Sequence, residues 1–259
     1  MEEVLRYFDA WTHDDQGRYV VIRDVHGVMR ARTDLALRSA HHQADLVTPD
    51  GVPLVWSAKL LGHSNIERVC GPDLLPATCA RGLEKGWRHY FYGGAPGMAD
   101  ALADRLRARF PGIAIAGTRC PPFRSLTKTE DQEDCDAILT AEPHFVWVGL
   151  GTPKQELWMK SHKVRLPGII LLGVGAAFDI HAGQAKRAPV WMQRSGLEWF
   201  FRLASEPRRL WRRYLLLAPH YFALFGFEFL LRRNRLGLYK APNVNSVGLS
   251  RTSKDNAER

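Results

Sequence analysis

The chain has 259 residues, of which 46% are hydrophobic and 24% are charged, and it contains no long low-complexity run. This composition excludes a disordered or fibrous protein and allows one large α/β domain or two small ones. The net charge is +9, and residues 181–235 account for +8 of it, with 11 Lys or Arg against three Asp or Glu, so we expect this segment to meet an anionic partner such as acidic lipid, a diphosphate or nucleic acid.

Strand-like and helix-like pieces alternate from about residue 19. The clearest helix-like piece is residues 98–110, where Met98, Leu102 and Leu106 recur every fourth residue on one face. Repeated βαβ units predict an α/β fold with a parallel sheet and helices on both of its faces. We predict strands at residues 19–22, 44–47, 89–92, 113–115, 145–148 and 168–172, and helices at residues 28–40, 98–110 and 154–162.

Beyond residue 190 the chain becomes aromatic, apolar and rich in arginine, which is typical of a membrane interface. The 18-residue run 214–231 is short for a membrane span and contains Pro219, His220 and Glu228. We therefore expect it to lie on the membrane or dip into it. The alternative is a helical subdomain packed on the core with its arginines in water. The long apolar run argues against a nucleic-acid patch.

Changes in composition divide the chain into three parts. We predict an α/β domain at residues 1–190 and a basic amphipathic appendage at residues 191–241. Residues 242–259 are polar and mixed, so we predict a disordered tail.

Cysteine usage and the N-terminus indicate the compartment. The four cysteines form no C-x-x-C pair, which favours reduced thiols in the cytosol. Residues 1–15 are acidic and lack the apolar segment of a secretory signal, so we expect an intracellular protein. The cysteines are Cys70, Cys79, Cys120 and Cys135.

Two glycine-rich turns join a predicted strand to a predicted helix, at residues 93–97 and 149–153. Small residues allow the backbone to approach a phosphate, and the helix that follows offers free N–H groups and the positive end of its dipole. Neither turn matches G-x-G-x-x-G or a P-loop. Tight turns without a ligand are therefore the alternative, since ligands gather at only some strand ends of such sheets.

Four aspartates, at three places in the chain, are candidates for chemistry. Asp50 lies in a Thr-Pro-Asp-Gly turn after a strand, where it can act as general base on an acceptor hydroxyl or bond its own backbone. Asp179 can bind a sugar hydroxyl or cap the next segment. Asp134 and Asp136 form a D-x-D pattern in an acidic helix-like run, which favours a solvated helix face, so we infer no metal.

Several short motifs follow one another between about Tyr19 and Tyr214. Together they resemble the WecG/TagA/CpsF family of glycosyltransferases (glycosyltransferase family 26). The motifs are Pro49-Asp50-Gly51, residues 67–74 (Glu-Arg-Val-Cys-Gly-Pro-Asp-Leu), Tyr92-Gly93-Gly94, residues 149–156 (Gly-Leu-Gly-Thr-Pro-Lys-Gln-Glu), residues 173–179, Ala182-Gly183, Arg187-Ala188-Pro189, Glu198-Trp199 and Glu206-Pro207-Arg208-Arg209.

The resemblance implies a Rossmann-like core and an inverting transfer of a sugar from a UDP-sugar to a polyprenyl-diphosphate-linked saccharide. Such reactions build exopolysaccharide, teichoic acid or common antigen. The resemblance also implies a peripheral location at the inner face of the cytoplasmic membrane, with the basic appendage reaching over the active site. No metal or other cofactor and no nucleic acid is expected as a partner, and a homo-oligomer is left open.

The resemblance places Asp50 on the proposed catalytic base and Arg68 and Gln155 on pocket positions. The leaving diphosphate is then stabilised by the two glycine turns and by arginine. The full set of expected substrate contacts is Asp24, His26, Arg68, Gly93, Gly94, Gly149, Gly151, Pro153, Gln155, Glu156, Asp179 and Arg187. Contacts with the acceptor diphosphate or the membrane are expected from Arg202, Arg208, Arg209, Arg212 and Arg213.

The chain departs from the family pattern on the first strand. Ile22, Asp24 and His26 stand where the family usually has Thr, Asn and His, and Asp24 can compete with Asp50 as base. One rival hypothesis is a nicotinamide-dependent oxidoreductase, but residues 22–27 lack G-x-G-x-x-G. The other is a non-catalytic membrane scaffold of a polysaccharide assembly complex.

Overall fold

The structure is a computed structural model that describes residues 1–235. The chain forms two compact units, Met1–Tyr221 and Phe222–Arg259. The predicted tail at residues 242–259 and the last residues of the predicted appendage, 236–241, lie outside the described residues. The first unit includes residues 191–221, while the boundary expected after residue 190 stays a prediction.

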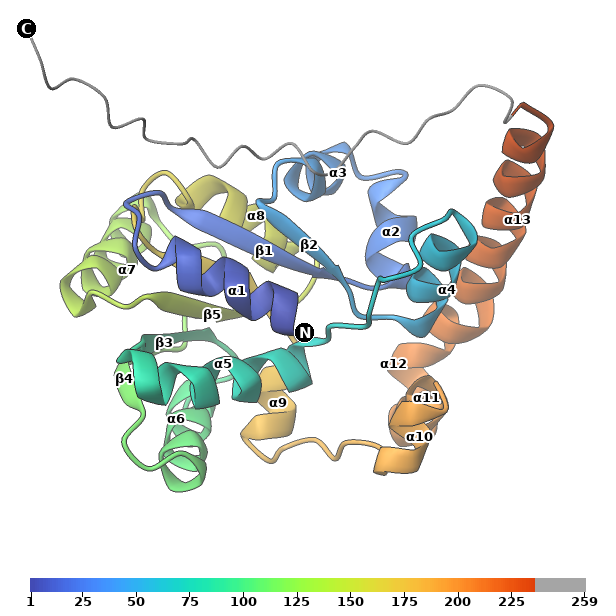
Figure 1. Cartoon of the computed structure of the whole chain (residues 1–259). Helices are drawn as coiled ribbons and strands as arrows, with labels where there is room; N and C mark the ends of the chain where they lie inside the picture. Colours follow the sequence, from blue (N-terminus) through green and yellow to red (C-terminus); the bar gives the residue numbers. More distant parts are fainter. Residues whose placement is uncertain (236–259) are drawn as a thin grey trace, which may run out of the picture. The chain divides into compact units, whose positions relative to one another are not determined.

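A parallel sheet in the order β2-β1-β6-β5-β3-β4 forms the centre of the first unit, which confirms the predicted α/β fold (Figure 1). The connection from β1 to β2 and the connection from β3 to β4 run in opposite directions across the sheet. Ligands of such sheets bind beyond the carboxyl ends of the strands. The strands are β1 (Arg18–Arg23), β2 (Leu46–Pro49), β3 (Arg88–Gly93), β4 (Ala114–Arg119), β5 (Phe145–Gly149) and β6 (Ile170–Gly173).

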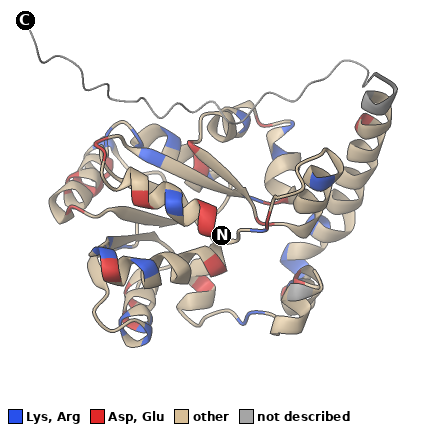
Figure 2. Ribbon diagram, viewed as in Figure 1, with Lys and Arg blue, Asp and Glu red and all other residues tan. Residues whose placement is uncertain are grey.

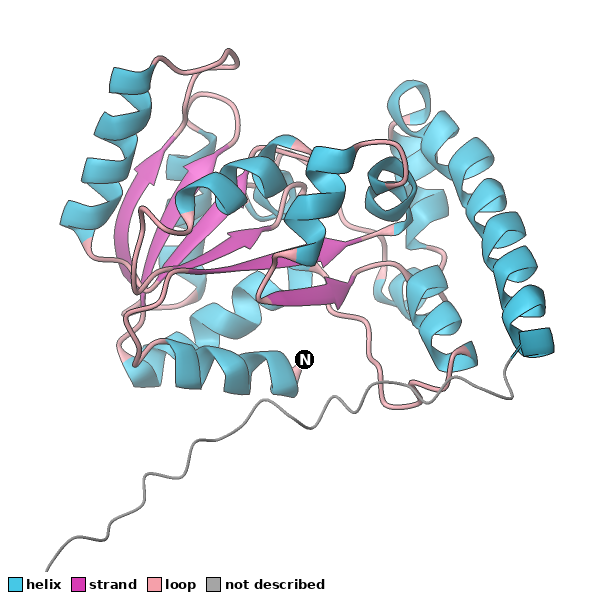
Figure 3. Cartoon of the chain, turned by 90° about the horizontal axis from the view of Figure 1, so that it is seen from above, coloured by secondary structure: helices cyan, strands magenta, loops and turns pink. Residues whose placement is uncertain are grey.

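Helices cover both faces of the sheet, as the view in Figure 3 shows. Val20 and Val21 on β1 enter different apolar clusters because successive strand residues point to opposite faces. Acidic and basic residues lie mainly on the helices and loops, while most strand residues are uncharged (Figure 2). The helices are α1 (Glu2–Trp11), α2 (Val25–Ala31), α3 (Leu35–His42), α4 (Val52–Leu60), α5 (Gly71–Lys85), α6 (Met98–Arg109), α7 (Lys128–Ala141), α8 (Lys154–His162), α9 (Ala177–His181), α10 (Val190–Arg194), α11 (Glu198–Ser205), α12 (Pro207–Trp211), the π-helix η1 (Arg212–Leu217) and α13 (Ala218–Arg235).

The single helix predicted at residues 28–40 is wrong, because two helices occupy this region. Asp24 caps the start of α2, where its side chain accepts a hydrogen bond from the Gly27 N–H at 2.8 Å. Asp34 then caps α3 by accepting from the Leu37 N–H at 3.0 Å. An aspartate at the N-cap satisfies backbone donors that the helix leaves free, so each cap starts a new helix.

The C-terminal segment, which is residues 190–235 of the described chain, exposes many large apolar side chains. Among the described residues, the helical stretch Pro207–Leu231 is long and apolar enough by composition to cross a membrane, with a mean hydropathy of 1.5 over its most apolar window. Only 6% of that window is buried. Exposed apolar residues before and within this stretch are Val190, Trp191, Leu197, Trp199, Phe200, Trp211, Leu215, Leu216, Phe222, Phe227, Leu230 and Leu231.

Candidate active site

Two carboxylates follow the carboxyl ends of two paired strands. Asp24 comes directly after β1, and Asp50 comes directly after β2. Arg23 is paired with Pro49 in the sheet, and the Asp50 N–H donates to the Arg23 carbonyl at 2.8 Å. The register of the sheet therefore places both carboxylates at the same edge, as expected for a site in a parallel α/β fold.

Asp50 lies against Arg68. The Arg68 Nη2 is 3.2 Å from the Asp50 Oδ1, and the Arg68 Nε donates to the Asp50 carbonyl. Burial raises the pKa of Asp50 above its ordinary value, the charge of Arg68 acts in the opposite direction, and the charge of Glu198 adds to the rise. The Asp50 side chain is still 29% exposed, so an acceptor hydroxyl can reach it. A partly exposed carboxylate with a raised pKa is suited to act as general base.

Glu198 connects α11 to this pair and is itself only 13% exposed. Its Oε2 accepts from Arg68 at 2.8 Å, and its Oε1 lies 3.4 Å from the Arg187 Nε. Arg187 in turn donates to both oxygens of Asp73, at 2.5 and 2.9 Å. Ionic contacts therefore run from Asp50 through Arg68, Glu198 and Arg187 to Asp73. Such pairs are stable in a buried site only when each charge has partners.

Sequence reasoning gave no role to Glu198, Asp73 or Cys70, although all three lie in the motifs that carry the resemblance. The Cys70 Sγ donates to the Asp73 Oδ2 at 2.9 Å. Burial raises the pKa of the Cys70 thiol, and the nearby Asp50 charge raises it further. The thiol therefore stays protonated at neutral pH, and its place is structural, since only the thiolate is a nucleophile.

Asp24 has partners on both carboxylate oxygens. Its Oδ1 accepts from the Gly27 N–H, and its Oδ2 forms an ion pair with Arg213 of η1. Burial lowers the pKa of Arg213. Arg213, which was expected to contact the acceptor or the membrane, thus joins the start of the C-terminal segment to the end of β1. This arrangement favours Asp50 over Asp24 as the base.

The glycine turns meet one another at the ends of β3 and β5. Gly93 is paired with Gly149, and a Cβ on Gly93 would lie 2.7 Å from the Gly149 carbonyl carbon. The Gly94 N–H donates to the Gly149 carbonyl at 3.1 Å, and the Gly151 N–H donates to the Gln155 Oε1 at 3.2 Å. These glycines are therefore required first by close backbone packing, and two of the expected phosphate donors have partners within the chain.

Gln155 and Glu156 are buried in the first turn of α8, after the Thr152–Pro153 peptide bond. The Thr152 hydroxyl donates to the Glu156 Oε1 at 2.8 Å. The Glu156 Oε2 is buried without a hydrogen-bond partner among residues 1–235, and burial raises the pKa of this carboxyl. An unpartnered buried oxygen is costly and points to a function, so both residues stay substrate-contact predictions.

A cavity of about 340 Å³ opens beside the glycine turns, within the size range of ligand sites. Lys154 at the start of α8 and Trp158 one turn later line it, as does the loop 121–127. The cavity thus combines a cationic group, an aromatic ring and backbone. Its lining residues in the glycine turns and neighbouring strand are Tyr92, Gly94, Gly149 and Leu150.

Arginines of the C-terminal segment act on the site. Burial raises the pKa of Asp179 on α9, and the charge of Glu206 adds to the rise. The charges of Arg209 and Arg202 lower this pKa. Arg202 also lowers the pKa of Asp50. This part of the appendage, which belongs to the first unit, therefore contributes positive charge near two of the predicted site residues.

The remaining predicted arginines lie on the surface. Arg208, Arg209 and Arg212 are exposed. Arg209 pairs with Glu206 at 2.9 Å, and the Arg212 guanidinium lies 5.3 Å from the centre of the Trp211 ring. Their positions are compatible with contact to an anionic surface, which stays a prediction. His26, on α2, lines a different cavity from the glycine turns.

The D-x-D pattern on α7 is not a solvated helix face, contrary to expectation. Asp134 is buried, where it accepts from the Tyr92 hydroxyl at 2.9 Å and from the Arg119 Nε at 2.7 Å. Asp136 is exposed and accepts from Gln132 at 2.8 Å. Residues two apart in a helix point to opposite sides, so the two carboxylates lie in different surroundings and do not face a common point.

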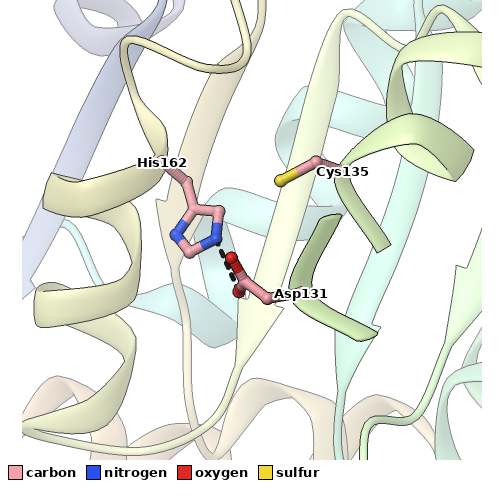
Figure 4. A group of neighbouring side chains, drawn as sticks. All are labelled: Asp131, Cys135 and His162. Carbon is pink, nitrogen blue, oxygen red and sulfur yellow. Dashed lines mark hydrogen bonds and ion pairs between the residues drawn. The ribbon is translucent and has the colours of Figure 1, made fainter. Parts of the chain in front are cut away.

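Asp131, Cys135 and His162 lie close enough to resemble a metal site, with their ligand atoms within 4.8 Å of one another (Figure 4). The His162 Nε2 is 3.0 Å from the Asp131 Oδ1. However, Arg165 donates to the Asp131 Oδ2 at 2.5 Å and lies 3.1 Å from the His162 Nε2. A guanidinium already neutralises the carboxylate here, so the cluster is an ion-pair network and does not fit a cation.

Comparison with known proteins agrees with the family that the sequence motifs resemble. Residues 1–235 match the profile of the glycosyl transferase WecG/TagA/CpsF family. An N-acetylglucosaminyldiphosphoundecaprenol N-acetyl-beta-D-mannosaminyltransferase of Bacillus spizizenii is 30% identical over 219 residues, which cover 85% of this chain and 83% of the relative. An enzyme of the same name from Bacillus subtilis is 29% identical over 199 residues, which cover 77% of this chain and 74% of the relative.

Proposed function

Because the chain belongs to the glycosyl transferase WecG/TagA/CpsF family and is a glycosyltransferase, we propose that it transfers a hexosyl or N-acetylmannosaminyl group from a UDP-sugar to a polyprenyl-diphosphate-linked saccharide. The acceptor class follows the two Bacillus relatives, which are named for transfer to N-acetylglucosaminyldiphosphoundecaprenol. The observation that carries the proposal is the position of Asp50 at the carboxyl edge of the sheet, partly exposed and bound by Arg68.

The proposed reaction is a single displacement. Asp50 accepts the proton of the acceptor hydroxyl while that oxygen forms a bond to the anomeric carbon. The bond from the anomeric carbon to the UDP oxygen breaks, and UDP leaves from the opposite face with the bonding electron pair. Arg68 orients the Asp50 carboxylate, because it binds both the side chain and the backbone carbonyl of that residue.

Positive charge for the leaving diphosphate comes, in this proposal, from arginine and not from a metal ion. Arg202 is the best placed, since its charge acts on both Asp50 and Asp179, whereas Arg209 acts on Asp179 and already pairs with Glu206. Arg187 is less available because Asp73 and Glu198 already bind its guanidinium. A guanidinium can bind a diphosphate through two parallel hydrogen bonds, which suits this role.

We further propose that the enzyme works at the inner face of the cytoplasmic membrane, in synthesis of a cell-surface polysaccharide. The exposed aromatic and aliphatic side chains of the C-terminal segment support this location, as do the exposed Arg208 and Arg212 beside them. A lipid-linked acceptor would then lie within reach of Asp50 without leaving the membrane.

The experiment that tests the function is UDP release across a panel of UDP-sugars, with polyprenyl-diphosphate-N-acetylglucosamine in vesicles, with and without EDTA. We expect acceptor-dependent release for one donor, with the same rate in EDTA. A rate abolished by EDTA would overturn the metal-free mechanism. Binding of UDP-sugars without any release would instead favour a non-catalytic scaffold.

A further inference from the structure

A second cavity, of about 500 Å³, lies between α2 and the start of the C-terminal helices, away from the glycine turns. Its lining combines basic groups with an apolar wall. The basic side is formed by His26, Arg30, Arg32 and His220, with Thr33, and the apolar side by Met29, Leu216 and Leu217. Every one of these residues belongs to the first compact unit.

Asp24 links the cavity to the edge of the sheet at which Asp24 and Asp50 lie. Asp24 caps α2, the helix that carries His26 and Arg30, and the same carboxylate pairs with Arg213 of η1, the helix that carries Leu216 and Leu217. Asp24 also follows β1, whose last residue accepts a hydrogen bond from the Asp50 N–H. The two walls of the cavity are therefore fixed to each other at the strand end beside Asp50.

The charges in the cavity suit a phosphate. Arg30 is exposed, and its ion pair with Asp34 is long, at 3.9 Å from Nε to Oδ2, while its charge also lowers the pKa of Glu156. Burial lowers the pKa of His26, and the charge of Arg30 lowers it further, so His26 is a neutral hydrogen-bonding group at pH 7. The Thr33 hydroxyl donates to the Arg30 carbonyl at 3.2 Å and lies on the same rim. Because the Thr33 donor is already used, the groups that remain for phosphate oxygens are the Arg30 guanidinium and the neutral His26 imidazole.

The apolar wall continues onto a surface that suits hydrocarbon. Leu216 is exposed, and so are its neighbours Leu215 and Trp211 on the same helical stretch. A ligand with a charged phosphate end and a long apolar tail would match both the basic rim and this surface.

We propose that this cavity binds the diphosphate end of the polyprenyl acceptor, with Arg30 contacting phosphate oxygens and the first isoprenoid units lying on Leu216 and Leu217. The proposal rests on the proposed function for the identity of the lipid. It gives the acceptor a site distinct from the surface arginines, and it directs the sugar end of the lipid past Asp24 toward Asp50.

The test is binding of the full chain to phosphatidylcholine vesicles doped with polyprenyl diphosphate, compared with vesicles doped with phosphatidylglycerol to the same surface charge. Arg30→Gln should weaken binding to the polyprenyl diphosphate vesicles at least about tenfold, the effect of losing a charge-assisted hydrogen bond. Binding to the phosphatidylglycerol vesicles should change less than about twofold. Arg38→Gln, which removes an exposed arginine of α3 outside the cavity, is the matched control and should bind as the unmodified chain does.

A second variant guards against a local effect of Arg30 on folding. Thr33→Glu places a carboxylate on the rim of the cavity and should weaken polyprenyl diphosphate binding in the same way. Equal losses on both vesicle types would overturn the proposal in favour of a general anionic contact, and no loss in either variant would also overturn it. Because vesicle binding needs no turnover, a selective loss in a chain that releases no UDP would reject the proposed reaction and keep the lipid site.

Discussion

Glu198 accepts a hydrogen bond from Arg68 at 2.8 Å, across 130 residues of sequence, and Arg68 binds Asp50 with the same Nη2 atom. The C-terminal segment thus contacts the residue that orients the proposed base. Glu198 is adjacent to the exposed Trp199 and Phe200, so α11 carries both an apolar surface and a contact to the candidate site.

Glu198→Gln should shift the pH dependence of the reaction. The charge of Glu198 raises the pKa of Asp50, so its removal lowers that pKa, and the acidic limb of the kcat/KM profile should move to lower pH. A weaker base should also lower kcat by roughly tenfold. The measurement is the pH profile of UDP release. Glu142→Gln is the control, because Glu142 is exposed and lies outside the candidate site. A loss of rate with no shift of the limb would assign Glu198 a purely structural part.

Asp50→Asn should remove activity without unfolding the chain. General-base catalysis contributes about 10²–10⁴-fold, so kcat should fall by that factor while UDP-sugar binding is retained. The pKa of Asp50 in the folded chain is above its ordinary value of 3.8, so its stabilising effect is present at acid pH and is lost as pH rises through the folded pKa. At neutral pH the ionised carboxylate therefore costs folding free energy, and the amide should leave Tm unchanged or raise it. Activity equal to that of the unmodified enzyme would remove Asp50 from the mechanism.

Most of the sheet could be predicted from the sequence because five of its six strands are short, mainly apolar runs that end in, or are followed by, glycine, proline or aspartate, with β4 as the exception. The predicted run 19–22, for example, lies within β1, Arg18–Arg23. Local patterns were less informative where tertiary contacts decide. Asp134 looks like one more acidic residue of a surface helix, and only Tyr92 and Arg119, which come from β3 and β4, explain its burial.

The candidate site could be predicted only in part, because some of its residues meet only in the folded chain. Asp50 and Arg68 are 18 residues apart in motifs that can be recognised, and the structure joins them directly. Glu198 completes the group from a helix in the C-terminal segment, and no spacing rule relates it to Arg68. The sequence offers Asp24 as a rival base, whereas in the structure its two oxygens are bound by a helix N-terminus and by Arg213.

Gly149→Ala should destabilise the fold at the glycine turns. A Cβ at this position would lie 2.7 Å from the Phe178 ring, which is buried beneath it. Overpacking of this kind costs about 1–3 kcal/mol, so Tm should fall by several degrees. Gly226→Ala is the contrasting control, since its Cβ would meet nothing within 4 Å in α13 and alanine favours a helix. An unchanged Tm for Gly149→Ala would show that Phe178 moves aside without cost.

Trp191→Ser combined with Phe200→Ser should weaken binding to vesicles that contain anionic lipid. Both side chains are more than half exposed in the C-terminal segment, at 63% and 55%. Each large apolar side chain that leaves water contributes about 1.5–3 kcal/mol when fully buried, so loss of two partly inserted rings should weaken binding by at least about tenfold. The measurement is flotation with vesicles, and Val164→Ser, which removes an exposed apolar side chain after α8, should float as the unmodified chain does. With a short-chain, water-soluble acceptor the double variant should keep its kcat, because among the described residues Arg68 hydrogen-bonds to Asp50 and to Glu198, not to these rings. Unaltered flotation would show that these rings do not insert, and would leave membrane contact to the arginines and the helix beyond Pro207.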